Sequence, residues 1–171
     1  MQNSTPTEPL SLIKAAADDL PLIENLMQFY NHDLSEWCSV EFSPSGLYAL
    51  QPKAQYWPKI SVKPCVARVN GEIAGFAVVD DEVQDPASEF NLGYFFLSRR
   101  YRGSGAAQKM IRQLFVRRPG RWEVYFFAAN RPAARFWPEA IALEAYRYIE
   151  VKDTVADGLD CRLYRFSTNA A

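Results

Sequence analysis

The spacing of apolar residues along the chain predicts three helices. Near the N-terminus, five of these residues recur every three or four positions, as on one face of a helix that packs against a core: Leu20, Ile23, Leu26, Met27 and Tyr30. The two aspartates that precede them, Asp18 and Asp19, offer N-cap chemistry. The same spacing predicts two further helices, over residues 103–118 and 133–142.

Apolar runs without this spacing predict the strands. They lie at residues 10–15, 65–69, 72–79, 90–97, 122–129, 146–151 and 161–166. Asn70-Gly71 and Asp157-Gly158 are typical of tight turns between antiparallel strands, whereas the prolines and the glycine of residues 42–59 favour loops and short helices. This order of elements predicts a mixed α/β fold around one central sheet.

The length and composition are those of one globular domain. The chain has 171 residues, of which 49% are hydrophobic and 23% are charged, and it is too short for two full domains. We expect polar tails at residues 1–8 and 169–171 and one domain over residues 9–168. No apolar run reaches the roughly 20 residues that span a bilayer, and the first residues lack a signal-peptide pattern. The sequence therefore predicts a cytoplasmic protein that does not enter a membrane.

Cysteine and histidine are too sparse to predict a metal site. The three cysteines, Cys38, Cys65 and Cys161, are far apart and form no Cys-x-x-Cys pair, so we expect buried thiols rather than a disulfide framework. The single histidine, His32, cannot build a zinc site with several histidines. We expect it to be a surface or capping residue, and we expect no metal.

Charge is strongly separated along the sequence. The net charge is −1, yet residues 99–135 contain ten Lys or Arg residues and one acid, Glu123, whereas the rest of the chain has nine basic and nineteen acidic residues. A cationic segment in a mildly acidic protein favours a confined anionic ligand over nucleic acid. Nucleic-acid binding through these arginines remains the less favoured alternative, because aromatic residues are not interleaved with them as in single-strand binders.

The segment that says most about function is a glycine turn between a predicted strand and a predicted helix. It reads Arg102-Gly103-Ser104-Gly105-Ala106-Ala107. Glycine lets the backbone approach a ligand closely, and the first amides of a helix present free donors and a positive dipole end. A phosphate suits such a turn, with Arg102 and Ser104 as additional donors. The alternative is a plain turn with a solvated basic rim, since neither a Walker A loop nor a complete dinucleotide motif is present.

Two stretches of the chain resemble the motifs of the GNAT acetyltransferases. The first, FFLSRRYRGSGAAQKMIRQLF, is similar to motif A and matches its Gln/Arg-x-x-Gly-x-Gly/Ala turn at three positions: Arg102, Gly105 and Ala107. The second, WEVYFFAANRPAARFW, is similar to motif B and matches it at Asn130, Ala133 and Phe136. The resemblance covers nearly the whole chain from about Pro9. Within this family, the chain looks most like a bacterial branch of predicted acetyltransferases.

This resemblance implies the GNAT fold, a mostly antiparallel central sheet flanked by helices, and a site for acetyl-CoA. In the family, the motif A turn holds the pyrophosphate, and the pantetheine arm enters a gap between two splayed strands and pairs with exposed backbone of the first. The implied cofactor-binding residues belong to that strand, the turn and motif B: Phe95, Phe96, Leu97, Arg102, Gly103, Ser104, Gly105, Ala106, Ala107, Asn130 and Phe136. Asn130 is equally suited to capping the helix that follows it.

The catalytic positions depart from the family pattern. Many members have a tyrosine that protonates the departing thiolate, but this chain has Trp137, whose indole N–H donates a hydrogen bond and is no acid at neutral pH. Asn91 and Gly93 stand where relatives often carry a catalytic glutamate. The remaining candidates for proton transfer are Glu36, Tyr94, Glu89 and the Asp80-Asp81 pair.

Glu36 ranks first among these candidates. It follows the first predicted helix, in a region that the family uses to wall the acceptor pocket, although it could equally be a solvated carboxylate that caps a short helix. Four aromatic residues could line the same pocket or simply pack in the core: Tyr30, Trp37, Tyr56 and Trp57.

Together these features predict an acetyl-CoA-dependent N-acetyltransferase. A primary amine, in a small molecule or a peptide, would attack the thioester directly while backbone amides polarise its carbonyl. The acidic remainder of the chain favours a cationic acceptor. The alternative from another class is a catalytically weak or inactive acyl-CoA-binding or regulatory module of the same fold. The resemblance is also compatible with a homodimer.

Overall fold

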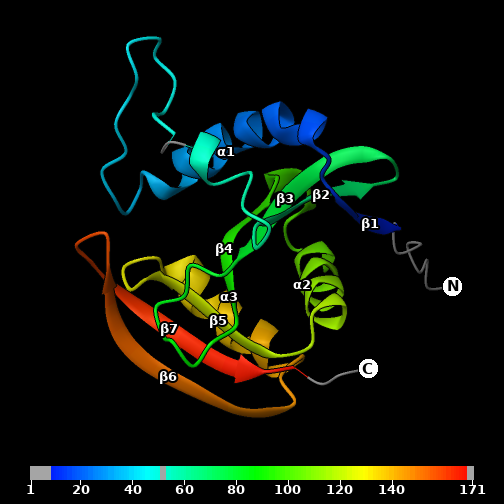
Figure 1. The fold of residues 1–171 in the computed structure, drawn as a ribbon, viewed down its shortest axis with the longest axis vertical. Helices are drawn as coiled ribbons and strands as arrows, with labels where there is room; N and C mark the ends of the chain where they lie inside the picture. Colours follow the sequence, from blue (N-terminus) through cyan, green and yellow to red (C-terminus); the bar gives the residue numbers. More distant parts are fainter. Residues whose placement is uncertain (1–8, 51–52, 169–171) are drawn as a thin grey trace, which may run out of the picture.

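The computed structural model describes residues 9–50 and 53–168, which form a twisted sheet with helices on both faces (Figure 1). In this described part, the sheet has seven strands in the order β1-β2-β3-β4-β5-β7-β6. The strands are β1 (Leu10–Lys14), β2 (Lys63–Val69), β3 (Glu72–Asp80), β4 (Phe90–Leu97), β5 (Arg121–Phe127), β6 (Arg147–Ala156) and β7 (Leu159–Ser167). The α-helices are α1 (Leu20–Leu34), α2 (Ala106–Arg117) and α3 (Arg131–Ala142), and short 3-10 turns lie at η1 (Ala17–Asp19), η2 (Lys53–Gln55) and η3 (Arg99–Tyr101).

The sheet is antiparallel except at its centre, where β4 and β5 run parallel. These two strands pair only at Phe90 with Trp122 and at Asn91 with Glu123. Each continues to pair with its other neighbour, β3 or β7, along most of its length. The two halves of the sheet therefore separate from Leu92 onward, and the predicted mixed, mostly antiparallel fold is confirmed.

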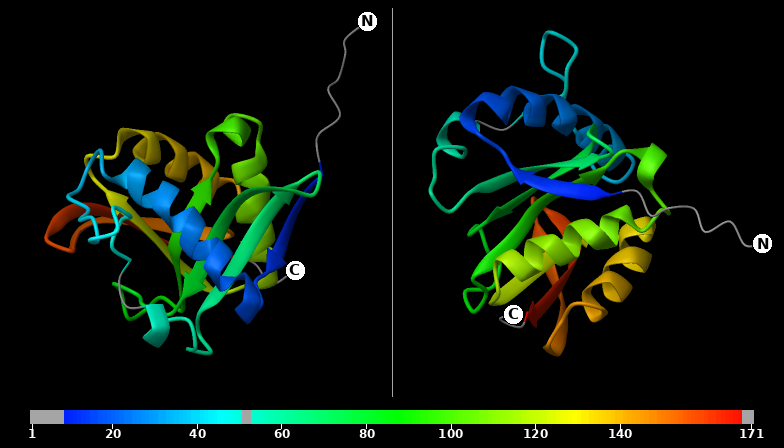
Figure 2. Two further views of the ribbon diagram at one scale, coloured as in Figure 1. Left: turned by 90° about the horizontal axis from the view of Figure 1, so that it is seen from above. Right: turned by 90° about the vertical axis from the view of Figure 1, so that its right-hand side faces the viewer.

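The helices divide between the two faces of the sheet (Figure 2). On one face, α1 packs against apolar side chains of β2 and β3, and the shared core includes Ile23, Met27, Val66, Phe76 and Val78. On the other face, α2 and α3 pack against residues of β1, β2, β3, β4, β5 and β7, and the core includes Met110, Leu114, Trp122, Ile141 and Phe166. The apolar spacing of α1 and α2 seen in the sequence thus matches the faces that these helices bury.

Both predicted tight turns are present. Asn70 and Gly71 have φ of 52° and 82°, and Asp157 and Gly158 have φ of 52° and 74°, the positive values that a type I′ hairpin turn requires. The closing hairpin is longer than predicted, because β6 and β7 run up to either side of their turn and pair as far as Ala156 and Leu159.

Several boundaries differ from the predicted ones. Helix α2 begins at Ala106 and not near Gly103, because Gly103 and Gly105 adopt left-handed φ of 77° and 82° that no α-helix contains. Helix α3 begins two residues early, at Arg131, and α1 continues to Leu34 through polar residues that carry no apolar signal. In the described part of the chain, no helix is long and apolar enough to cross a membrane.

Candidate active site

The separation of β4 and β5 opens a groove of about 990 Å³ through the sheet. One wall is β4 with the glycine turn, and the opposite wall is β5 with the tip of the β6–β7 hairpin. The end of α1 and the turn after it border the groove on one face of the sheet, and the starts of α2 and α3 border it on the other. Segments from four parts of the chain therefore meet at this opening.

The main chain of β4 turns polar groups toward the groove, along the stretch where β5 does not pair with it. The amide of Ser98, just after the strand, donates to the carbonyl of Ala74 in β3 at 2.8 Å. Because backbone groups alternate in direction along a strand, those of Phe95 and Leu97 face the other way, toward β5. The carbonyl of Leu97 accepts a hydrogen bond from Nε of Arg102 at 2.8 Å. The expected cofactor-pairing stretch thus lies along the open edge.

The glycine turn leads from η3 into the first amides of α2. Gly105 is the N-cap residue of α2 and gives it no side-chain cap, so the first amides of the helix point out of its N-terminal end. A Cβ on Gly105 would meet no atom within 4 Å, which means that its positive φ, and not crowding, calls for glycine. Gly103 and Ala107 of this turn line the groove.

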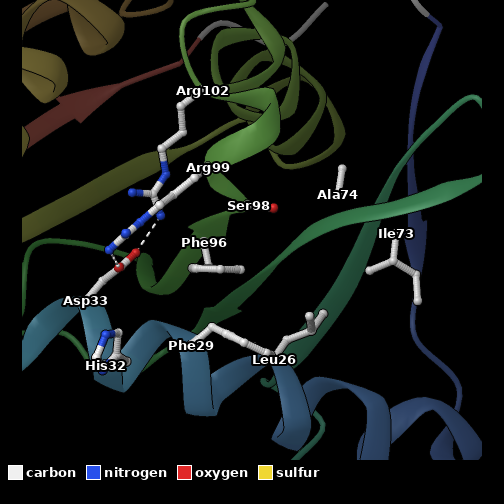
Figure 3. Close-up of a pocket in the computed structure, with 10 residues that line it drawn as sticks. All are labelled: Leu26, Phe29, His32, Asp33, Ile73, Ala74, Phe96, Ser98, Arg99 and Arg102. Atoms are coloured by element: carbon white, nitrogen blue, oxygen red, sulfur yellow. Dashed lines mark hydrogen bonds and ion pairs between the residues drawn. The ribbon is translucent and has the colours of Figure 1, made fainter.

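The two polar side chains of the turn are engaged within the protein. Ser104 donates its hydroxyl to the carbonyl of Tyr101 at 2.6 Å, so it is committed to the turn rather than offered to a ligand. Arg102 donates to Asp33 of α1 at 2.5 Å as well as to Leu97. Arg99 of η3 donates to the other oxygen of Asp33 at 3.0 Å (Figure 3).

On the face covered by α2 and α3, the groove is aromatic. Phe95 contacts Trp137 edge-on with ring centroids 5.2 Å apart and stacks with Phe136 at 6.3 Å. Trp137 is only 8% exposed but lines the groove together with these two residues. Asn130 also borders the groove, and its side chain accepts from the amide of Ala133 at 3.0 Å. It is therefore the N-cap of α3, the second of the two roles considered for it.

On the face covered by α1, tyrosines dominate the groove. Tyr30 and Tyr94 meet edge-on with centroids 5.3 Å apart, and Tyr125 of β5 lies across from them. Burial, followed by the charge of Asp80, raises the pKa of Tyr94 to about 12. Burial, followed by the charge of Asp157, likewise raises the pKa of Tyr125 to about 12. Both phenols stay protonated at neutral pH, so they can donate hydrogen bonds but do not act as bases.

Carboxylates border the same face of the groove. Glu36 is exposed in the turn after α1 and lines the groove, as does Asp157 at the hairpin tip. No helix follows Glu36 in the described residues up to 50, so the capping role considered for it is wrong. Trp37 and Tyr30 of the predicted aromatic set are also groove residues.

Other candidate residues lie outside the groove. Glu89 accepts from the amide of Arg121 at 2.9 Å, at the start of β5. Trp57 donates to Glu24 at 3.0 Å, and Tyr56 donates to Asp80 at 2.6 Å. These contacts assign Trp57 and Tyr56 to the packing of α1 and the η2 segment rather than to an acceptor pocket.

Asp80 is buried beneath the α1 face of the sheet. Its carboxylate also accepts from Nδ2 of Asn91 at 2.9 Å. Burial raises the pKa of Asp80, and the hydrogen bonds from Tyr56 and Asn91 partly oppose this. A Cβ on Gly93 would lie 2.3 Å from Oδ2 of Asp80, so a side chain at position 93, glutamate included, would displace this carboxylate.

In the folded chain, acidic side chains partly neutralise the cationic segment. Acids from elsewhere in the sequence pair with five of its ten basic residues: Arg99 and Arg102 with Asp33, Arg100 with Glu72, Arg112 with Glu144, and Arg121 with Glu89. The expected confined anion site is therefore limited to the glycine turn and its neighbours. In the described residues, no three His, Cys, Asp or Glu side chains gather as metal ligands do.

Sequence reasoning did not single out Asp33, Tyr125 or Asp157. Asp33 carried one weak signal, because an acid in the last turn of a helix opposes the helix dipole. Tyr125 lies between Val124 and Phe126 in an apolar run, so nothing in the sequence distinguished it from a core residue. Asp157 was assigned only to its turn. All three line the groove only because α1, β5 and the β6–β7 hairpin, which are far apart in the sequence, come together in the fold.

Comparison with known proteins places this architecture in one family. The model of the acetyltransferase (GNAT) family matches residues 26–140. The fold is similar to that of an acetyltransferase from Thermus thermophilus, at a TM-score of 0.66 and 10% identity over 92% of this chain and 96% of that one. It is also similar to spermidine N-acetyltransferase from Vibrio cholerae in complex with CoA and spermine, at a TM-score of 0.61 and 14% identity over 93% of this chain and 95% of that one. No curated protein matches the sequence significantly. The chain belongs to the acetyltransferase (GNAT) family.

Proposed function

We propose that this enzyme transfers the acetyl group of acetyl-CoA to a primary amine inside the groove between β4 and β5. The observation that carries the proposal is the separation of these strands after only two paired positions, beside the N-terminus of α2, which follows β4 through η3 and the glycine turn. An unpaired strand edge can pair with the amides of a pantetheine arm, and the helix N-terminus suits its phosphates.

The proposed cofactor position uses both features. The pyrophosphate would lie against the amides of residues 103–107, and the pantetheine arm along the backbone of residues 95–97. Phe136 and the cap residue Asn130 would border the arm on the β5 side, where both line the groove. The thioester would then lie level with Tyr94 and Phe95, between the aromatic cluster of one face and the tyrosines of the other.

The proposed reaction needs one nucleophile and two proton movements. The unprotonated amine nitrogen attacks the thioester carbonyl carbon, backbone amides of β4 stabilise the oxyanion, and the C–S bond then breaks. The nitrogen loses a proton, and the proposed proton acceptor is Glu36, a carboxylate on the acceptor face of the groove. The departing thiolate gains a proton, for which the protonated hydroxyl of Tyr94 is a donor. The indole of Trp137 can only hydrogen-bond.

The proposed acceptor is a cationic amine. Glu36 and Asp157 border the α1 face of the groove, and the two arginines there are already paired with Asp33. An amine that carries a second positive charge matches this arrangement. The structural neighbour bound to CoA and spermine makes polyamines a sensible first set to test.

An acceptor screen that follows CoA release tests this proposal. We expect acetyl-CoA to raise the melting temperature, since a ligand at about 100 times its dissociation constant adds about 2.7 kcal/mol of stability. We then expect CoA release with at least one amine among polyamines, amino acid amides, aminoglycosides and lysine peptides. Stabilisation by acetyl-CoA without release for any amine would support the alternative, a binding or regulatory module. No stabilisation at all would refute the cofactor assignment.

A further inference from the structure

Asp33, in the last turn of α1, points toward Arg99 and Arg102, which precede the glycines of the turn (Figure 3). Each of its carboxylate oxygens accepts from a different guanidinium, Oδ1 from Arg99 at 3.0 Å and Oδ2 from Arg102 at 2.5 Å. Among the described residues that line the groove, these two arginines are the only Lys or Arg. The cations available to an anionic ligand in the groove are thus already held by an internal anion.

The position of this carboxylate is not explained by its helix. A negative charge in the last turn of an α-helix is unfavourable, because the exposed carbonyls there form the negative end of the dipole. Burial alone would raise the pKa of Asp33, yet hydrogen bonds from Arg102 and Arg99 bring it below its ordinary value. Only 23% of the side chain is exposed. The two arginines are therefore what stabilises Asp33 in place.

The two arginines differ in how firmly they are held. Arg102 also donates to the carbonyl of Leu97, and its guanidinium lies 5.8 Å from the ring centroid of Phe96. Arg99 donates to Asp33 and keeps 76% of its side chain exposed. Arg99 can therefore turn toward a ligand at the cost of one ion pair on its exposed side, and pairs of this kind contribute little to stability.

We propose that Asp33 competes with the phosphates of acetyl-CoA for Arg99 and Arg102 and so limits the affinity for the cofactor. This proposal rests on the proposed function, because it concerns the same groove and the same ligand. The arginine pair with Asp33 has a net charge of one positive unit instead of two. The carboxylate also repels phosphates that lie within a Debye length of about 10 Å. By this competition, Asp33 keeps CoA binding weak enough for product release.

The test compares Asp33→Asn with the unmodified protein by calorimetric titration with CoA. Asparagine keeps the size of the side chain, removes its charge and relieves the dipole conflict in α1. We expect CoA to bind about three- to tenfold more tightly in about 50 mM NaCl, and this gain to shrink in about 300 mM NaCl. Acetyl-pantetheine, which lacks the phosphates at issue, should bind equally to both proteins. Asp18→Asn, an exposed carboxylate before α1, controls for the change in net charge.

A double-mutant cycle with Arg99→Gln separates competition from simple orientation. If Asp33 competes, Asp33→Asn strengthens CoA binding less in the Arg99→Gln background than in the original protein. Unchanged or weaker CoA binding by folded Asp33→Asn would overturn the proposal and leave Asp33 as a residue that orients the arginines. An equal gain for acetyl-pantetheine would overturn it too. Failure of the original protein to bind CoA at all would instead refute the proposed function, and this proposal with it.

Discussion

Replacing Glu123 with glutamine tests how much one buried carboxylate contributes to stability beside the point at which the groove opens. Glu123 belongs to the last residue pair that joins β5 to β4 and is 0% exposed. Its two oxygens accept from the backbone amides of Gln84 at 2.5 Å and Asp85 at 3.0 Å. The only acid of the cationic segment thus ties the β3–β4 loop to β5, next to the separation of the strands.

The expected loss of stability follows from the hydrogen bonds that glutamine cannot make at this position. Its amide oxygen can accept from one backbone N–H, but its NH₂ group must face the other, which leaves a buried donor unsatisfied at a cost of about 1 to 3 kcal/mol. The remaining hydrogen bond also loses its charge, which costs about 1 kcal/mol more. We therefore expect Glu123→Gln to lower the free energy of unfolding by about 2 to 4 kcal/mol, a large part of a typical total of about 5 to 15 kcal/mol.

Urea denaturation measures this loss. The midpoint should fall while the slope of unfolding free energy against urea stays constant, and the melting temperature should fall by about 2 to 4 °C per kcal/mol. Glu139→Gln makes the same chemical change at an exposed position of α3 and should leave stability within about 0.5 kcal/mol. A loss below about 1 kcal/mol for Glu123→Gln would refute the reasoning, because the burial of the charge would then cost as much as its hydrogen bonds contribute.

Three further predictions concern the turn, the tyrosine face and acid stability. Gly105→Ala and Gly46→Ala should each lower the free energy of unfolding by about 1 kcal/mol, because both glycines have φ near +80°. An added Cβ would meet no neighbour at either position. Only Gly105→Ala should weaken CoA binding in titrations. Tyr94→Phe should lower kcat by about 10²-fold or more in the CoA-release assay without changing the Kd of acetyl-CoA, and a full kcat would exclude this hydroxyl as the proton donor. The hydrogen bond from Lys152 is the main cause that lowers the pKa of Asp85 from 3.8 to about 2. The stability that this pairing contributes is complete above about pH 4 and is lost as the pH falls to 2. Asp85→Asn should therefore make the midpoint of urea unfolding depend less on pH between 4 and 2. An unchanged pH dependence of the midpoint would contradict this pairing.

Local signals in the sequence predicted most of the fold. The apolar spacing of residues 20–30 and the Asn70-Gly71 turn depend on neighbours a few positions away, and both elements are present. The separation of β4 and β5 could be expected only from the family resemblance, because it depends on which strands pair and for how long. The predicted helix boundaries were wrong at two kinds of position. Polar residues extend α1 beyond its apolar spacing, and the positive φ of Gly105 makes α2 begin later than predicted.

The candidate site was predictable in its backbone but not in its charges. The glycine turn and the strand before it are contiguous in sequence, so their spacing identifies them. The partner of Arg99 lies 66 residues away, and no local pattern connects the two. Counting charges along residues 99–135 therefore overstated the field at the turn, because acids from α1, β3 and the segment after α3 fold back onto the arginines.

Gly93, one of the two residues at positions where the family resemblance implies a glutamate, also decides which side chains of β4 face the α1 side of the groove. In the pairing of β3 with β4, Val78 is opposite Tyr94 and Val79 is opposite Leu92, so Gly93 is an extra residue that bulges from β4. Without this bulge, strict alternation would turn Tyr94 away from the face on which Asn91 meets Asp80. With it, the hydroxyl of Tyr94 reaches the tyrosine side of the groove, and the next residue, Phe95, packs against Trp137 on the opposite side. Tyr94 is thus a protonated tyrosine on the face of the groove where we propose that the acceptor binds. Under the proposed function, proton return to the thiolate should therefore depend on Tyr94 and not on Trp137.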